Sequence, residues 1–180
     1  MADPAALSDR NSERRFRAVL GHFPTGVVVV TAIDGDGQPV GMSVGTFMSV
    51  SLDPPLVGFL SALTSTSYPR IRESGSFCIN VLSADQEQLC RGFAASGSHK
   101  FDGIDWWPAG SGSPRLVGVV AWIDCDVETV HRTGDHDIVI GRVRDLDVAS
   151  VGLPLVFFRG GFGEFTPRSL TDPAQPDLLG

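Results

Sequence analysis

The chain has 180 residues, of which 42% are hydrophobic and 19% are charged, and this predicts one globular domain with a substantial core. Its formal net charge is −7 at pH 7, which disfavours nucleic acid as a partner because phosphate backbones would be repelled. No apolar run is long enough to span a bilayer or to act as a signal peptide. The three cysteines show no pairing pattern, so we expect a cytoplasmic protein with reduced thiols and no membrane partner.

The first part of the chain predicts one helix followed by short strands. Residues 1–11 read as a flexible lead-in, and Ser12 is a candidate N-cap for a helix that stops near Gly21. The Asp-Gly-Asp-Gly stretch over 34–37 indicates a hairpin turn. Stretches rich in β-branched or alternating apolar residues predict strands over 26–31, 39–43, 47–51 and 56–60.

The rest of the chain predicts two more helices and the remaining strands. One helix begins after Ser67 and stops at Gly75, and a capping-box spacing starts another over 83–91. Residues 95–115 are rich in Gly and Ser and read as a long loop pinned by two tryptophans. Further strands are predicted over 77–81, 117–130, 136–143 and 155–158.

About seven short strands and only three helices predict a mainly β fold. Their close spacing, with frequent Gly and Pro between them, is typical of a closed or half-closed antiparallel barrel. We expect this barrel to form a single domain over residues 12–165. A Pro- and Asp-rich segment follows, which reads as a loose tail over 166–180.

A stretch of small and hydroxyl-bearing residues from Gly41 to Ser51 is the first candidate binding segment. It carries further hydroxyls at Ser43, Thr46 and Ser49. Glycine and small polar side chains allow backbone N–H groups to approach a planar ring or a phosphate. The alternative is a strand that exposes a Ser/Thr face to solvent.

A second hydroxyl cluster, Ser65-Thr66-Ser67, stands at the predicted start of a helix and is followed by Arg70. Unpaired N–H groups at a helix start, hydroxyls and a guanidinium together suit a phosphate. A simple helix N-cap is the alternative for this segment taken alone. Two such clusters in one small domain favour a phosphate-bearing cofactor.

The turn Gly134-Asp135-His136-Asp137 places a histidine between two carboxylates. A neighbouring carboxylate would hold the imidazole in one tautomer or favour its charged form. The alternative is a surface turn with a solvated histidine. The four histidines show no metal-ligand spacing with one another or with a cysteine, so we expect no metal site. No GxGxxG motif follows a strand, which argues against a Rossmann site for a nicotinamide cofactor.

Taken together, these segments resemble the flavin reductase family with an FMN-binding split β-barrel. Its members are the reductase components of two-component flavin-dependent monooxygenases. The similarity covers residues 14–165 and includes the run Leu52-Asp53-Pro54-Pro55-Leu56 and the turn Gly134-Asp135-His136. The matching motifs lie at 16–27, 41–56, 75–82, 99–101, 134–136 and 158–160.

The resemblance implies an NAD(P)H:flavin oxidoreductase that reduces FMN or FAD and supplies the reduced flavin to a partner monooxygenase. It also implies a homodimer with flavin at a barrel edge near the subunit interface. The step is hydride transfer from nicotinamide C4 to flavin N5, which needs stacking and alignment more than acid–base groups. The choice between NADH and NADPH as co-substrate stays open. NADH is favoured, because no arginine pair that could bind the 2′-phosphate of NADPH is evident near the His136 turn.

The resemblance also assigns roles to particular residues. The 41–51 stretch would lie along the ring and ribityl chain, the Ser65-Thr66-Ser67 turn would take the phosphate with Lys100 or Arg91, and His136 would position the nicotinamide as the catalytic residue. The implied cofactor-binding residues are Thr25, Gly41, Met42, Ser43, Val44, Gly45, Thr46, Phe47, Ser49, Ser51, Ser65, Thr66, Ser67, Arg91, Lys100, Asp135, His136 and Phe162.

Two positions depart from the family pattern. Gly45 stands where relatives often carry a hydroxyl or another small side chain, and Phe162 stands where many relatives carry Tyr. Each removes one expected polar contact. Three alternatives remain on the same barrel: a non-catalytic flavin- or haem-binding module, an oxidase of the pyridoxamine-phosphate type, and a structural dimerisation domain.

Overall fold

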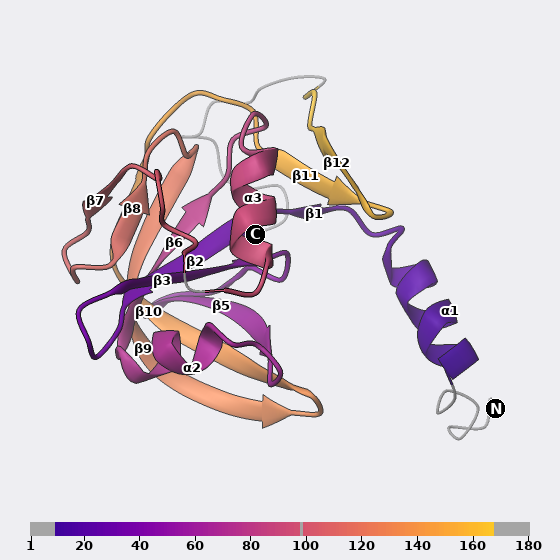
Figure 1. The fold of residues 1–180 in the computed structure, drawn as a ribbon, viewed down its shortest axis with the longest axis horizontal. Coiled ribbons are helices and arrows are strands. Elements are labelled where there is room, and N and C mark those ends of the chain that lie inside the picture. The colour runs from indigo at the N-terminus through magenta and orange to yellow at the C-terminus, as the bar shows by residue number, and fades with distance from the viewer. Residues whose placement is uncertain (1–9, 98, 168–180) are drawn as a thin grey trace.

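Antiparallel strands dominate the described part of the chain, residues 10–97 and 99–167 of a computed structural model (Figure 1). The helices are α1 (Arg10–Leu20), α2 (Tyr68–Glu73) and α3 (Glu87–Ala94). The strands are β1 (Thr25–Gly26), β2 (Val28–Ile33), β3 (Pro39–Val44), β4 (Met48–Leu52), β5 (Pro55–Ala62), β6 (Ser76–Val81), β7 (Trp106–Pro108), β8 (Pro114–Leu116), β9 (Ala121–Thr133), β10 (His136–Val148), β11 (Leu155–Phe158) and β12 (Gly161–Glu164). The prediction of a mainly β fold is confirmed.

Seven strands form one antiparallel sheet in the order β3-β2-β6-β9-β10-β5-β4. β3 and β4 lie at its two edges, and no ladder joins them in the described residues. The loop between them instead returns to β5, where Oγ1 of Thr46 accepts the N–H of Leu60 at 2.9 Å. The sheet therefore curls into a half-closed barrel, which confirms the split-barrel prediction.

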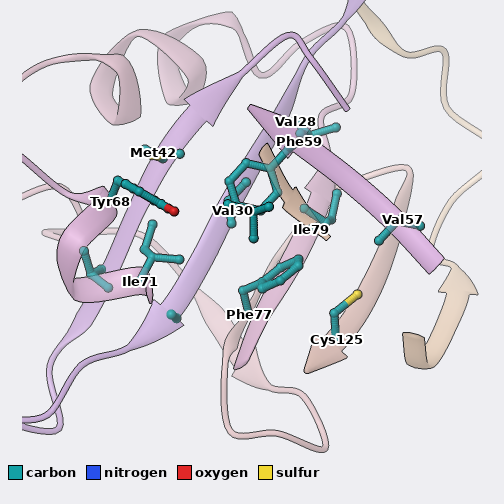
Figure 2. Close-up of a cluster of buried hydrophobic side chains, with 13 residues drawn as sticks. Val28, Val30, Met42, Val57, Phe59, Tyr68, Ile71, Phe77, Ile79 and Cys125 are labelled. Atoms are coloured by element: carbon teal, nitrogen blue, oxygen red, sulfur yellow. The ribbon is translucent and has the colours of Figure 1, made fainter. Parts of the chain in front are cut away.

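Apolar side chains from both halves of the sheet fill the barrel (Figure 2). Phe59 on β5 and Phe77 on β6 meet edge to face, with ring centroids 5.3 Å apart. Tyr68 and Ile71 join the same cluster from α2, and the Tyr68 hydroxyl points inward in Figure 2. The helix that begins after the Ser65-Thr66-Ser67 turn is thus fixed to the barrel by its own buried side chains.

A second cluster of buried side chains lies between the barrel and α3. Phe93 and Cys90 of α3 pack there with Val29 and Leu82. A Cβ at Gly41 would lie 2.7 Å from a ring carbon of Phe93, so β3 needs glycine at this position for α3 to pack closely. This packing brings the C-terminal end of α3 beside β3.

The β9–β10 hairpin carries the histidine turn. Thr133 pairs with His136, so the turn itself consists of Gly134 and Asp135. Gly134 has a φ of 61°, in the left-handed region that glycine adopts without strain. Because side chains alternate along a strand, His136 and Asp137 leave β10 on opposite faces.

A separate sheet, in the order β1-β11-β12, supports α1 at one end. The N–H of Arg159, in the β11–β12 turn, donates to the carbonyl of Gly21 at 3.0 Å, and the rest of α1 extends away from the barrel (Figure 1). Large apolar side chains on this segment are exposed, namely Phe16, Val19, Leu20 and Phe23. An isolated helix of this length is marginal in water, and the described residues leave this apolar face largely uncovered.

Two helix starts differ from the prediction. α3 begins at Glu87 and not near Ser83, because Ser83 forms a bridge with Pro154 and the chain stays extended there. The capping-box contact is present only in part, since the N–H of Ser83 donates to Oε1 of Gln86 at 3.0 Å. α1 begins at Arg10, so Ser12 lies inside the helix and is not its N-cap.

The expected long loop over 95–115 contains the short hairpin of β7 and β8, so that prediction is wrong in part. The hairpin is fixed by a buried side chain, since the N–H of Leu116 donates to Oδ1 of Asn80 at 2.7 Å. The strand expected over 117–130 is β9, which starts at Ala121, and β10 continues to Val148. The predictions for 1–9 and 168–180 lie outside the described residues.

Candidate functional site

A cavity of about 330 Å³ opens where β3 and β5 end and β10 begins, beside the start of α2 and the end of α3. Its size falls in the range of small-molecule sites. The lining residues are Met42, Ser43, Val44, Gly45, Thr46, Leu60, Ser61, Ala62, Thr64, Ser65, Thr66, Ser67, Phe93, Ala94, Ala95, Ser96, Lys100 and His136. The structure therefore brings Ser43 and Thr46 of the first segment, the Ser65-Thr66-Ser67 turn, Lys100 and His136 to one cavity.

Lys100 is the cation of this cavity, and it is held by three protein acceptors. Its Nζ lies 2.9 Å from the carbonyl oxygen of Phe93, 3.2 Å from that of Gly41 and 3.0 Å from Oγ of Ser67. These contacts use all three N–H donors of the ammonium group. Burial lowers the pKa of Lys100 below its usual range. The side chain thus joins β3, α3 and the turn before α2.

The Ser67 hydroxyl becomes a hydrogen-bond donor to any ligand in the cavity. Its oxygen accepts from Lys100, and its own proton has no acceptor in the described residues. Ser67 is buried at the wall of the cavity and precedes α2. Thr64 and Thr66 also line the cavity, and no protein hydrogen bond involves their hydroxyls in the part of the chain that the structure describes. An anion in the cavity would therefore meet free hydroxyl donors beside an ammonium group.

The hydroxyls of the 41–51 stretch are more constrained than the sequence suggests. Ser43 donates to the carbonyl of Cys90 at 2.8 Å, so it can only accept from a ligand. Oγ1 of Thr46 bonds to both backbone groups of Leu60 and serves the barrel closure. Ser49 and Ser51 lie on the edge strand β4, away from the cavity lining.

Gly45 leaves room for the hydroxyl of Thr25. A Cβ at position 45 would lie 2.9 Å from Oγ1 of Thr25, so the missing side chain is replaced in space by a neighbouring hydroxyl. Thr25 is on β1, outside the direct lining of the cavity. The departure of Gly45 from the family pattern therefore comes with a hydroxyl from another strand.

His136 faces the cavity from the first position of β10. Its Nδ1 lies 2.7 Å from Oδ1 of Asp135, and the hydrogen bond from this ring lowers the pKa of Asp135 below its usual range. This contact assigns the proton to Nδ1 and leaves Nε2 without a protein partner in the described residues. The ring can thus offer Nε2 as an acceptor to a ligand. Asp135 itself does not line the cavity.

Two arginines expected at the phosphate are engaged elsewhere. Arg70 donates to Oδ2 of Asp34 through Nε at 2.8 Å and through Nη2 at 2.5 Å. Arg91 pairs with Glu87 at 2.7 Å on the exposed side of α3, and its guanidinium lies 4.9 Å from the ring centre of Phe162. Neither arginine lines the cavity, so Lys100 is the cation that the structure places there.

The structure corrects the expectation that no arginine pair lies near the histidine turn. Arg132 contacts Oδ1 of Asp137 at 2.8 Å, and Arg72 lies 3.7 Å from Oδ2 of the same carboxylate. The sequence could not show this, because Arg72 belongs to α2 and reaches Asp137 only through the fold. Both guanidiniums are drawn to Asp137, so their presence does not itself favour NADPH.

Two other residues predicted to bind the cofactor, Gly41 and Phe47, serve the packing of the barrel and do not line the cavity. Gly41 packs under Phe93 and gives its carbonyl to Lys100, while Phe47 packs against the barrel core. Two groups of lining residues were missed by the sequence analysis, 60–62 and 64 at and after the end of β5, and 93–96 at and after the end of α3. The hydroxyls of Ser61, Thr64 and Ser96 were the signal available for them.

Comparisons with known proteins agree with this geometry. A family model described as a flavin reductase like domain matches residues 20–166. A flavin reductase from Pseudomonas putida is 55% identical over 150 residues, which cover 83% of this chain and 88% of that protein. The reductase subunit HsaB of a flavin-dependent monooxygenase from Rhodococcus jostii is 44% identical over 177 residues, covering 98% and 90%.

The fold is shared with a solved structure of similar extent. An NADH:FAD oxidoreductase from Streptomyces globisporus, solved with NAD and FAD fragments, matches with a TM-score of 0.82 at 34% identity. The match covers 89% of this chain and 97% of that one. The resemblance inferred from the sequence motifs is thereby confirmed.

Proposed function

Because this chain belongs to the family of flavin reductase like domains, we propose that it uses NADH or NADPH to reduce FMN or FAD. The reduced flavin is released to a partner flavin-dependent monooxygenase, as the name of the Rhodococcus relative indicates for that protein. The observation that carries the proposal is the single cavity onto which Ser67, Lys100 and His136 all face.

The residues of the cavity fit a flavin phosphate at the end that Lys100 occupies. The donors there are the hydroxyls of Thr64, Thr66 and Ser67, and the ammonium group supplies the compensating charge. Gly45 carries no side chain of its own, so a planar ring can lie against the backbone beside Val44, close to the Thr25 hydroxyl. When bound, the flavin supplies the acceptor atom for a hydride from nicotinamide C4.

His136 orients the nicotinamide from the opposite side of the same cavity. Asp135 fixes the ring, and Nε2 is available to accept from a polar group such as the carboxamide. No protein group needs to exchange a proton for a hydride to move, so alignment is the contribution of these residues. Because the Streptomyces protein is named an NADH:FAD oxidoreductase, NADH is the favoured co-substrate for this chain as well.

Flavin-dependent oxidation of NADH tests this function directly. The purified chain is mixed with NADH or NADPH and, in separate reactions, with FMN, FAD or riboflavin, and the loss of reduced-nicotinamide absorbance is followed. We expect oxidation only when a flavin is added. If flavin binds but neither nucleotide is oxidised, the chain is a flavin-binding module and the enzymatic proposal fails.

The exposed apolar face of α1 supports a homodimer. Phe16, Val19 and Leu20 lie on one helix and stay more than half exposed among the described residues, and Phe23 follows them with 73% of its surface exposed. A second copy is the occupant in our proposal, because a symmetric pair would cover both copies of this face at once. Light scattering should report a dimer that Phe16→Glu combined with Val19→Glu converts to monomer. A wild-type monomer would exclude it.

We also place the protein in the cytoplasm. The three cysteines, Cys78, Cys90 and Cys125, are buried free thiols, as expected in a reducing compartment. No helix in the described ranges has the length and apolar character needed to cross a bilayer.

A further inference from the structure

A buried carboxylate lies directly behind the histidine of the cavity. Asp137 follows His136 on β10, and only 2% of its side-chain surface is exposed. It accepts hydrogen bonds from Nε of Arg132 at 2.8 Å and from the hydroxyl of Tyr68 at 3.1 Å. Arg72 lies 3.7 Å away and adds a second positive charge. The carboxylate is thus fully engaged, although its own side chain is outside the cavity lining.

Two of the three partners of Asp137 come from α2, and the third, Arg132, lies beside it on β9. Tyr68 and Arg72 are on α2, which packs against β2, β3 and β6. The residue before Tyr68 is Ser67, and the carbonyl of Ser67 accepts the N–H of Ile71 at 3.2 Å. Ser67 is therefore attached by its backbone to the first turn of α2, next to the residue that Asp137 holds. Through Tyr68 and Arg72, Asp137 is thus bound to α2, the helix that follows the proposed phosphate donor Ser67.

His136 is held to β5 and not to α2. It pairs with Ala62 across the ladder, and the N–H of Leu63 donates to the carbonyl of Asp135 at 3.0 Å. The cavity is therefore built between two structural units, one of β5 and β10, and one of β3, α2 and Lys100. The Asp137 cluster ties these two units together next to the site.

We propose that Asp137 is a positioning residue for hydride transfer: by holding Tyr68, Arg72 and Arg132, it fixes the separation between His136 and the Ser67 turn. The proposal rests on the function proposed above, because the separation matters only if flavin and nicotinamide occupy the two sides. Hydride transfer depends steeply on the distance and alignment of the flavin and nicotinamide rings. The affinity for each ligand depends instead on the residues that contact that ligand.

Stability alone is a weak reason for this cluster. Burying a carboxylate carries a desolvation penalty, and apolar replacements of buried ion pairs are often neutral or stabilising. The chain contains a matched case in Asp124, which is also fully buried and accepts from the N–H and hydroxyl of Ser111 at 2.8 Å and 2.5 Å. Asp124 fixes the turn before β8 and does not touch the cavity. Asp124 therefore serves as the control: it is a buried carboxylate that holds no residue next to the cavity.

The test compares Asp137→Asn, Tyr68→Phe and Asp124→Asn with wild type. The hydride-transfer rate constant is measured by anaerobic stopped-flow loss of oxidised-flavin absorbance at saturating NADH, and FMN affinity is measured by titration. We expect Asp137→Asn to slow hydride transfer about tenfold or more, because small misplacements are costly for this step. The KM for NADH and the affinity for FMN should stay within about twofold of wild type.

Tyr68→Phe keeps the buried ring and removes only the hydroxyl. It therefore tests the hydrogen bond between Tyr68 and Asp137 even if Asp137→Asn folds poorly. It should slow hydride transfer in the same direction, while Asp124→Asn should lower thermal stability without slowing it. The proposal is overturned if Tyr68→Phe reacts at the wild-type rate, or if rate, KM and affinity all fall together as stability falls. A wild-type protein that oxidises no NADH would instead refute the proposed function.

The single tyrosine of the chain gives an independent spectroscopic readout. Burial, together with the Asp137 carboxylate, raises the pKa of Tyr68 from 10.0 to about 12. A rapid pH-jump measurement of tyrosinate absorbance should show this value in wild type and in Asp124→Asn, and a lower one in Asp137→Asn. An unchanged pKa in Asp137→Asn would show that the carboxylate does not hold Tyr68.

Discussion

The two walls of the cavity use their polar groups differently. The wall around Lys100, which we call the lysine wall and which includes Ser43 and the Ser65-Thr66-Ser67 turn, is organised by protein hydrogen bonds before any ligand arrives. The wall at the ends of β5 and β10, the histidine wall, presents His136 with one side-chain partner, Asp135. A pre-organised wall loses little freedom when it binds, whereas a single ring on a hairpin can orient a second ligand that must come and go.

This contrast predicts that charge changes on the lysine wall affect flavin binding most. Ser67→Asp places a carboxylate where the phosphate should lie, and FMN affinity should fall tenfold or more, or ~1.5–3 kcal/mol, as for a charged hydrogen bond. Fluorescence titration measures the affinity, and riboflavin, which has no phosphate, is the matched ligand control. Equal losses for FMN and riboflavin would place the phosphate elsewhere.

Loss of the ammonium group should weaken the lysine wall itself. Lys100→Met leaves the carbonyls of Gly41 and Phe93 without this donor and should lower the free energy of unfolding by ~1–3 kcal/mol. Urea denaturation measures the change. Glu87→Gln removes the exposed pair with Arg91, leaves Arg91 over the Phe162 ring and should cost only ~0.3–0.5 kcal/mol. Similar losses for both variants would mean that Lys100 does not organise this wall.

Substitutions on the histidine wall should change the kinetics with NADH and leave the affinity for flavin nearly unchanged. His136→Ala should raise the KM for NADH and cost roughly 1–2 kcal/mol of transition-state stabilisation, since the ring orients the nicotinamide. FMN affinity should barely change, because the flavin contacts lie on the other wall. His131→Ala, an exposed histidine on β9, is the control and should behave as wild type. Wild-type NADH kinetics for His136→Ala would remove it from the nicotinamide site.

The smallest effect concerns the space at Gly45. Gly45→Ala adds a Cβ that displaces the Thr25 hydroxyl, which the family resemblance assigns to flavin binding, and loss of that neutral hydrogen bond should cost ~0.5–1.5 kcal/mol of FMN affinity. Thr25→Val should lower the affinity by the same amount. The double variant should lose no more than either single variant, because both remove one contact. Additive losses would show that the two positions act separately.

The local pattern of the chain was enough for its β character, for most strands and for the histidine turn. β-branched runs and glycine-bearing turns depend on neighbours within a few residues, so they can be read from the sequence. The same holds for the motifs that carry the family resemblance. The local pattern was misleading where tertiary contacts competed with it. The helix predicted to start at Ser83 begins later, because Ser83 forms a bridge with Pro154. Arg70, predicted to contact a phosphate, binds Asp34 instead.

The composition of the cavity was decided by contacts between distant segments. Ser43 meets Cys90 across 47 residues and Tyr68 meets Asp137 across 69, because α3 and α2 pack on the barrel where the order of its strands places these partners. No local pattern encodes that order. By itself the sequence determined which groups could bind a flavin and a nicotinamide. Only the folded sheet decided which hydroxyls keep a free proton, which cation reaches them, and what ties the two walls together.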